Sequence, residues 1–410
     1  MSIRDFDLVI AGAGPAGCTL ALKLAHLGLH IAVIDKDVFP RHKICGDALS
    51  GQAINVLKRL PDGVFNDFIH QVEKVPSHGI RFVAPNFQFI DIPFFLNQRT
   101  DLEAPGFICK RTEFDTFLFN RLKGYNNISL FEGERIIEVD NSIDFVSVKT
   151  SKNIFHAPIV AGADGVHSII RESIHPEKVS KKHFCVGIRA YFENVADLHP
   201  GNFIELIFLK ELLPAYFWIF PSSKGQANVG FGMMQNRIID QKENLSLLFS
   251  SFINSHPLLS PRFKNAIQVS KAQAHSLPLG TYHLPLTTDR LILMGDAAFL
   301  VDPFSGEGIG NAMASGEIAA SVLTGCFQNH DFSLGSLKEY DYRIAKRFGS
   351  PFRTTTILQQ LAKSAWLFNL VINKAHKNKS IQNLLTTMYT QEEVKKQLTR
   401  PGFYLKLLFK

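Results

Sequence analysis

A glycine-rich run near the N-terminus has the residue types and spacing needed to hold a dinucleotide. Residues 12–17 read GAGPAG, which matches G-x-G-x-x-G, and Asp35 ends the next apolar run. The first glycine permits a tight turn, the second lets the backbone approach a pyrophosphate, and the third allows close packing of a helix on a strand. The helix start offers free N–H groups to phosphate, and Asp35 can accept hydrogen bonds from a ribose diol. The alternative is a structural turn that binds no nucleotide.

The segments around this run predict the elements that such a site needs. Residues 7–11 are apolar, 18–27 have apolar positions at helical spacing, and 31–34 are apolar again. This order predicts a strand, a helix and a second strand, which is the unit of a parallel sheet with a right-handed crossover. A further helix is predicted over 113–122.

The chain then leaves this unit and returns to it. From about residue 76 it has short Phe-rich runs with Pro and Asn, and residues 181–275 contain several runs that predict an antiparallel sheet. Residues 291–294 predict a strand, and a helix near 311–323 follows. We expect a discontinuous cofactor domain over 1–75, 100–180 and 281–330. A substrate domain is expected over 76–99 and 181–280, and a C-terminal helical region over 331–410.

Two further motifs indicate which dinucleotide is bound. Residues 162–171 read GADGVHSIIR, and LMGDAA at 293–298 precedes DPFSGEGIGNA at 302–312. Together with the glycine-rich run, these segments resemble, in order, the motifs of the FAD-containing family built like p-hydroxybenzoate hydroxylase. The resemblance covers most of residues 5–325. It implies a mixed α/β (α+β) fold, with a Rossmann-like FAD-binding domain interleaved with an antiparallel-sheet substrate domain, plus C-terminal helices.

The resemblance also implies roles for single residues. Asp296 resembles the aspartate that binds the flavin ribityl or ribose hydroxyls, and 306–311 resemble the loop and helix start that face the isoalloxazine ring. Free N–H groups at a helix start stabilise the negative charge of reduced flavin. Arg111 resembles an arginine beside the cofactor, although a solvated cation at a helix start is the alternative. The implied FAD contacts are Gly12, Ala13, Gly14, Pro15, Ala16, Gly17, Asp35, Lys36, Arg41, Cys45, Gly46, Arg111, Asp164, Gly165, Gly295, Asp296, Gly306, Gly308 and Ile309.

A finer resemblance lies in residues 39–51, which read FPRHKICGDALSG. They resemble the segment of the geranylgeranyl reductase branch in which a Cys-Gly pair lies by the flavin. The second signature of that branch is matched by YFWIFP at 216–221 and NVGFG at 228–232. Asp47 departs from many relatives, which have glycine there, so the shape or polarity beside Cys45 is expected to differ. Cys45 is the candidate catalytic residue as a proton donor; it could equally shape the pocket or be a small buried hydrophobe.

The aromatic strand predicts where a substrate lies. Tyr216, Trp218 and Phe220 could line an apolar tunnel for a long isoprenoid or polyene, leaving flavin N5 as the reactive contact. The alternative is an ordinary core, since most of the 35 phenylalanines must be core residues. The function expected is therefore a FAD-dependent oxidoreductase that reduces carbon–carbon double bonds of a lipophilic substrate by hydride transfer from reduced flavin.

Other functions remain open on the same motifs. A monooxygenase that uses NAD(P)H and O2 is the first alternative, and a halogenase is weaker, because its W-x-W-x-I-P strand is matched only in part. A membrane-associated flavin redox sensor without turnover is the alternative that is not an enzyme. A second nucleotide-binding unit does not occur in the sequence, so the electron donor is expected to be transient NAD(P)H or reduced ferredoxin.

The remaining sequence excludes several chemistries. The chain has 410 residues, 46% hydrophobic and 20% charged, which suits a globular protein. Its five cysteines are far apart and never in C-x-x-C spacing, so neither disulfides nor a metal site is expected, and a reducing compartment fits. The sequence contains no H-E-x-x-H, G-x-S-x-G or P-loop motif. The sequence predicts no particular oligomeric state.

Basic residues gather at the C-terminal end. Residues 338–410 contain 14 Lys and Arg but only 4 Asp and Glu, although the whole chain has a net charge of only +7. Trp366, Phe403, Tyr404 and Leu407 lie among these cations, which favours an anionic membrane surface over nucleic acid. An amphipathic tail packed on its own domain is the alternative. Neither a run of about 18 apolar residues nor a signal peptide is evident, so we expect a cytoplasmic protein with peripheral contact to the inner face of the membrane.

Overall fold

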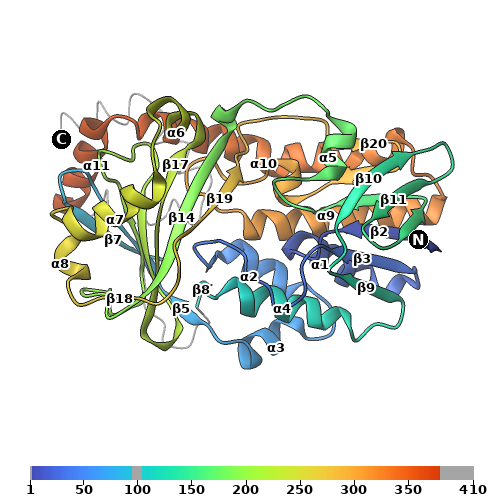
Figure 1. Ribbon diagram of the computed structural model, residues 1–410, viewed down its shortest axis with the longest axis horizontal. Coiled ribbons are helices and arrows are strands. Elements are labelled where there is room, and N and C mark those ends of the chain that lie inside the picture. Colours follow the sequence, from blue (N-terminus) through green and yellow to red (C-terminus); the bar gives the residue numbers. More distant parts are fainter. Residues whose placement is uncertain (1, 95–103, 379–410) are drawn as a thin grey trace.

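A six-stranded sheet carries the glycine-rich run. The computed structural model of the chain describes residues 2–94 and 104–378 (Figure 1). The strand order is β20-β21-β13-β2-β3-β9, and every neighbouring pair is parallel except β20 with β21. The strands are β2 (Leu8–Ala11), β3 (Ile31–Asp35), β9 (Ile128–Glu132), β13 (Val160–Gly162), β20 (Thr287–Thr288) and β21 (Leu291–Leu293). The predicted parallel unit is confirmed, and its apolar strands are buried, as parallel strands generally are.

Helices cover one face of this sheet. They include α1 (Pro15–Leu24), α4 (Arg111–Leu122) and α9 (Ile309–Asn329). The first helix begins three residues before the predicted start, because Pro15 suits the first turn of a helix. It packs closely on α9: a Cβ at Gly316 would lie 2.5 Å from the carbonyl oxygen of Ala16.

A four-stranded sheet lies against the same core. Its order is β1-β12-β11-β10, and Val146, Val148 and Phe155 from it share one hydrophobic cluster with the strands β2 and β13. The strands are β1 (Ile3–Asp5), β10 (Ile136–Asn141), β11 (Val146–Thr150) and β12 (Ile154–Ala157). This sheet and the helices together exclude water from the parallel strands.

An eight-stranded sheet forms the second body of the molecule, on the left of Figure 1. Its order is β18-β14-β17-β16-β15-β6-β7, with β19 also paired to β14. The strands are β6 (Gly79–Val83), β7 (Phe89–Pro93), β14 (Phe184–Glu193), β15 (Ile204–Ile207), β16 (Phe217–Pro221), β17 (Gln226–Met234), β18 (Ile267–Gln268) and β19 (Gln273–Pro278). The sheet is antiparallel as predicted except at β15 and β6, which pair in parallel because β6 arrives from a much earlier part of the chain.

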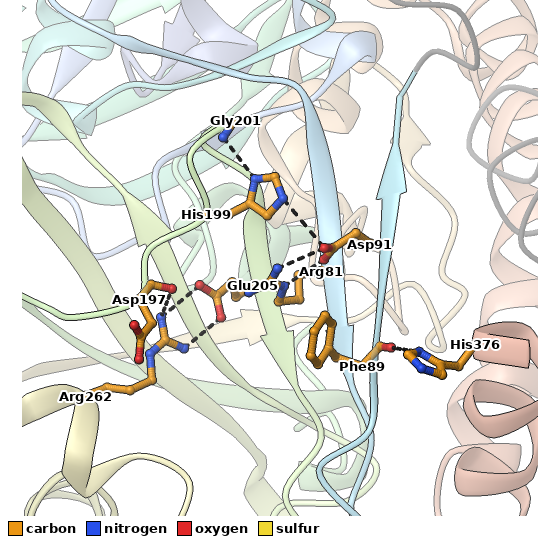
Figure 2. Close-up of polar contacts among 9 residues, drawn as sticks. All are labelled: Arg81, Phe89, Asp91, Asp197, His199, Gly201, Glu205, Arg262 and His376. Atoms are coloured by element: carbon orange, nitrogen blue, oxygen red, sulfur yellow. Dashed lines mark hydrogen bonds and ion pairs between the residues drawn. The ribbon is translucent and has the colours of Figure 1, made fainter.

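The two faces of this sheet differ. One face packs under α7 (Leu245–Ser255) and α8 (Ser260–Phe263) through Phe249, Phe252 and Phe263. At the edge of that face Arg262 donates two hydrogen bonds to Glu205, which is 1% exposed, and Arg81 pairs with Asp91 (Figure 2). The other face turns toward the parallel sheet.

Smaller elements join the two bodies. A three-stranded sheet has the order β4-β8-β5 and lies beside two short helices. These elements are β4 (Ala48–Leu49), β5 (Val75–Ser77), β8 (Gly106–Ile108), α2 (Gly51–Lys58) and α3 (Val64–Gln71). Two more short helices are α5 (Ile169–Ile174), which follows β13, and α6 (Gln235–Gln241), which follows β17. The predicted domain boundaries stay a prediction, and their parts at residue 1, 95–103 and 379–410 lie outside the described residues.

Two helices follow, as predicted for the C-terminal region. α10 (Leu334–Leu361) runs from the parallel sheet to the eight-stranded sheet, and α11 (Ala365–Lys377) packs on β7. His376 on α11 lies against the carbonyl group of Phe89 on β7 (Figure 2). Among the described residues no helix is both long and apolar enough to cross a membrane. Phe403, Tyr404 and Leu407 lie outside the described residues.

Candidate cofactor and substrate site

A cavity of 1590 Å³ lies where the carboxyl ends of β2 and β3 meet the inner face of the eight-stranded sheet. Ligands of open α/β sheets bind at this edge. Of the residues predicted to contact cofactor or substrate, all line the cavity except Ala13 and Gly17, which lie behind its surface. The structure therefore brings together three motifs and the aromatic strand, and the individual roles of these residues stay predictions.

The glycine-rich run is shaped by backbone contacts. Gly12 has φ +100°, and a Cβ there would lie 2.4 Å from the carbonyl oxygen of Ala163. A Cβ at Gly17 would lie 2.0 Å from the carbonyl oxygen of Gly12, whereas one at Gly14 would meet nothing closer than Arg41 at 3.6 Å. The first and third positions thus need glycine for packing, and the middle position leaves space for a ligand.

Asp35 fixes this loop from the end of β3. Its carboxylate accepts hydrogen bonds from the N–H groups of Ala13, at 2.8 Å, and Asp37, at 2.9 Å. Burial raises the pKa of Asp35, and these two donors and Arg41 lower it in part. Asp35 still lines the cavity, so it can both hold the loop and face a ribose.

A buried ion cluster lies beside the loop. Arg111 donates two hydrogen bonds of 2.7 Å to Asp115, and Arg41 lies 2.9 Å from the same carboxylate. Arg111 is only 7% exposed, so the alternative of a solvated surface cation is wrong. The two arginines line the cavity while Asp115 lies behind them, so two guanidinium groups share one carboxylate and positive charge is left at the cavity wall for an anionic ligand.

At the helix start predicted to face the flavin ring, one backbone N–H group already has a partner within the chain. α9 begins at Ile309, and the Gly310 N–H donates to the carboxylate of Glu307 at 3.0 Å, which also accepts from the Ser50 hydroxyl at 2.6 Å. Asp296 precedes this helix in a short 3₁₀ turn (Gly295–Ala298) and lines the cavity. Sequence reasoning assigned no role to Glu307 or Ser50.

The Cys-Gly pair lies directly against the aromatic strand. A Cβ at Gly46 would lie 2.9 Å from the ring of Phe220 and 3.8 Å from the indole nitrogen of Trp218. The carbonyl group of Cys45 accepts a hydrogen bond of 2.8 Å from Asn228. Burial raises the pKa of the Cys45 thiol, although Arg111 lowers it in part, so this thiol keeps its proton at neutral pH.

Asp47 explains how this segment is held. It has φ +68°, a left-handed conformation that favours glycine, and its side chain is fully buried. Its carboxylate accepts hydrogen bonds from the Tyr191 hydroxyl, from Asn228 at 2.8 Å and from the Arg111 N–H at 3.3 Å. Sequence reasoning missed Tyr191 altogether and gave Asn228, the first residue of the NVGFG run, no role of its own, because these residues lie 144 and 181 positions from Asp47 in the chain.

The aromatic rings line the cavity, and the polar atoms of Tyr216 and Trp218 are hydrogen-bonded. The Trp218 indole N–H donates to Asn228 at 3.0 Å, and the Tyr216 hydroxyl donates to the carbonyl group of Ser305. Glycine makes room for the indole, since a Cβ at Gly230 would lie 2.4 Å from Trp218. These contacts produce an apolar wall without unpaired polar atoms from the aromatic side chains.

Lys43 and His275 form another contact that sequence reasoning missed. The Lys43 ammonium group lies 2.7 Å from the His275 imidazole, and both line the cavity. Burial lowers the pKa of His275 to about 3, so its ring is neutral and can accept a hydrogen bond from the Lys43 ammonium group. The contact joins the segment before Cys45 to β19.

The cradle fits FAD. Two of its buried polar atoms, Arg41 Nε and Asp164 Oδ1, have no hydrogen-bond partner among the described residues. Such atoms need partners of the kind that phosphate and ribityl groups supply. The profile of the family described as FAD binding domain matches residues 5–327. The chain belongs to that family.

The comparisons with single proteins agree with this assignment. The chain is 27% identical over 358 residues to a digeranylgeranylglycerophospholipid reductase of Thermoplasma volcanium, covering 84% of this chain and 85% of the relative. It is 27% identical over 329 residues to a menaquinone reductase of Mycolicibacterium smegmatis, covering 78% and 76%. The predicted FAD cofactor and the predicted resemblance to geranylgeranyl reductases are confirmed.

Solved structures show the same fold. A geranylgeranyl bacteriochlorophyll reductase-like protein of Thermoplasma acidophilum superposes with a TM-score of 0.81 at 22% identity, covering 97% of this chain and 99% of that one. A flavin-dependent brominase superposes with a TM-score of 0.75 at 18% identity, covering 94% and 93%. At these identities the likeness confirms the predicted fold, and the reaction must be inferred from the residues of the site.

Proposed function

We propose that this FAD-binding protein reduces carbon–carbon double bonds of a lipophilic prenyl or polyene substrate. When bound and reduced, FAD supplies the hydride. The observation that carries the proposal is the contact of Gly46 with Phe220 and Trp218 inside one cavity, which joins the two signatures of the geranylgeranyl reductase branch. The relatives named as reductases of geranylgeranyl lipids and of menaquinone support it.

The residues of the chain have separate tasks in this reaction. The rings of Trp218 and Phe220 bind an apolar chain and exclude water. The Cys45 thiol holds a proton beside them, and this proton or one from water joins the carbon that does not receive the hydride. The double bond thereby gains two hydrogen atoms. The electrons come from NAD(P)H or reduced ferredoxin.

The reaction can be tested without oxygen. Photoreduced holoenzyme is mixed anaerobically with a geranylgeranyl lipid, and flavin absorbance and product mass are followed. We expect flavin reoxidation and a product heavier by two hydrogen atoms per bond reduced. Flavin that stays reduced would contradict the proposal, and a hydroxylated or halogenated product formed only with air would replace it with a monooxygenase or halogenase.

Two variants assign the tasks. Cys45→Ser keeps a smaller, less acidic proton donor and should slow turnover about tenfold or more without changing the KM, if the thiol gives the proton. Trp218→Leu should raise the KM more than it lowers kcat. Turnover of Cys45→Ser equal to that of the wild type would leave water as the proton source.

We also propose peripheral contact with the cytoplasmic face of a membrane through the C-terminal region. Trp366 on α11 is 63% exposed, and Lys363, Lys374 and Lys377 lie on or beside the same helix. Lys379 lies outside the described residues. Cations with an interfacial aromatic residue suit an anionic lipid surface and would give access to a substrate dissolved in the bilayer.

Vesicle binding tests this contact. Full-length holoenzyme should sediment with vesicles of phosphatidylcholine and phosphatidylglycerol and be released at high salt. Trp366→Phe removes the exposed one of the two tryptophans, so a blue shift of fluorescence on binding should disappear with it. Absence of binding at low salt would refute the contact.

A further inference from the structure

An arginine in the cavity wall, Arg189, has no ion-pair partner in the part of the chain that the structure describes. Arg189 lies on β14, is 4% exposed and lines the cavity. Within residues 2–94 and 104–378 its side chain has neither a hydrogen bond nor an ion pair, and its Nε is buried without a partner. Its guanidinium group lies 4.5 Å from the ring centre of Tyr191, a contact that offsets only part of the lost hydration.

The nearby carboxylate is already used. Asp47 influences Arg189 through its charge, but its oxygens accept hydrogen bonds from Tyr191, Asn228 and the Arg111 backbone. Asp47 lies farther from Arg189 than an ion pair allows. The buried guanidinium group therefore has donors available toward the cavity.

Arg189 lies beside the aromatic wall. Gly230 separates the two: a Cβ at this position would lie 2.4 Å from the Trp218 ring and 2.8 Å from Arg189 Cβ. Two residues farther along β14, Gly187 pairs with His275, which holds the Lys43 ammonium group. This part of the wall thus combines an apolar surface with two cations.

We propose that Arg189 binds an anionic oxygen, from a phosphate or carboxylate, on the polar head of an amphiphilic substrate whose apolar chain lies on Trp218. The proposal rests on the proposed function and specifies its substrate class. A guanidinium group forms paired hydrogen bonds with such oxygens, and an apolar chain with a neutral head would leave it unpaired.

Arg262 offers a matched control. It is a largely buried arginine of the same body, with a side chain 11% exposed, but it packs on the opposite face and donates two hydrogen bonds to Glu205 (Figure 2). Arg262→Met leaves a buried carboxylate unpaired and should lower the thermal midpoint. Arg189→Met removes an unpaired buried charge, so its midpoint should equal or exceed that of the wild type.

Binding to oxidised holoenzyme tests the proposal without turnover, so failure of the reduction reaction would not decide it. Geranylgeranyl phosphate and geranylgeraniol have the same chain, and each is titrated while the flavin absorbance is followed. Arg189→Met should weaken binding of the phosphate roughly 10- to 100-fold and that of the alcohol less than twofold. Arg189→Lys should recover part of the loss.

Three results would overturn the proposal. One is equal weakening of both probes, and another is no weakening of either. The third is a comparable loss of FAD affinity in Arg189→Met, measured by titrating apoprotein with FAD, which would assign the guanidinium group to the cofactor. Arg343→Met, an exposed arginine on α10, controls for net charge if Arg262→Met does not fold.

Discussion

The two walls of the cavity are built in different ways. The cofactor wall is made by backbone, because Gly12 and Gly17 let main-chain atoms approach within distances that no side chain would permit. The substrate wall is made by side chains, because Asp47, Tyr191 and Asn228 hold the Cys-Gly segment against the aromatic strand. A wall of backbone is encoded in neighbouring residues, whereas a wall of side chains is distributed over the whole chain.

The largest effect should come from the backbone wall. In Gly17→Ala the new Cβ would lie 2.0 Å from the carbonyl oxygen of Gly12, so α1 must shift away from the loop. We expect a loss of about 3 kcal/mol in stability and at least a hundredfold loss of FAD affinity, measured by unfolding and by FAD titration. Gly325→Ala on α9 meets nothing within 4 Å and should bind FAD as the wild type does. Normal FAD affinity in Gly17→Ala would contradict the close approach.

The side-chain wall should be broken next most strongly by Asp47→Ala. This variant leaves the Tyr191 hydroxyl and the Asn228 amide without their acceptor, which should cost about 3 kcal/mol in stability. Asp47→Gly suits the left-handed backbone and should be about 1 kcal/mol more stable than Asp47→Ala. Chemical denaturation of the three proteins checks both numbers, and equal stability of the two variants would show that backbone strain at this position is negligible.

Gly230→Ala should separate the two walls. Its Cβ would lie 2.3 Å from the carbonyl oxygen of Ile188 and 2.4 Å from the Trp218 ring, so both β14 and the indole must move, at about 2 kcal/mol in stability. Lipid affinity should fall at least tenfold while FAD affinity changes less than threefold. Parallel titrations with lipid and FAD measure this difference, and an equal loss of both would mean that the walls are one mechanical unit.

The smallest effect concerns pH. Burial raises the pKa of Asp47 above 3.8, so the folded protein keeps a proton that the unfolded chain has released. This contribution to stability is present below pH 3.8 and is lost as the pH rises through the raised pKa. As the pH rises above 3.8 the wild type should therefore lose stability relative to Asp47→Asn. The free energy of unfolding of both proteins is measured as a function of pH. Curves that stay parallel would show that Asp47 does not carry this proton.

The contrast between the walls also explains what could be predicted. Residues 12–17, Asp35 and the aromatic strand were identified because their patterns are local and their neighbours are strands and helices of the expected period. The parallel pairing of β15 with β6 was not predicted, because register between distant segments has no local signal. The same holds for Tyr191, which matters because it donates to Asp47, and for Arg189, which matters because its buried Nε has no partner among the described residues.

The interrupted order of the strands has a consequence for synthesis of the protein. β21, the outermost of the parallel strands, and α9, which packs on α1, follow the whole eight-stranded sheet in the chain. A ribosome-bound chain that ends before residue 291 contains the glycine-rich run and the strands β3 and β13 that flank β2, but it lacks α9, which packs on α1. Contacts of such long separation form late. We therefore expect FAD to be captured after most of the chain has left the ribosome, and mutations that slow folding of the eight-stranded sheet to delay cofactor loading.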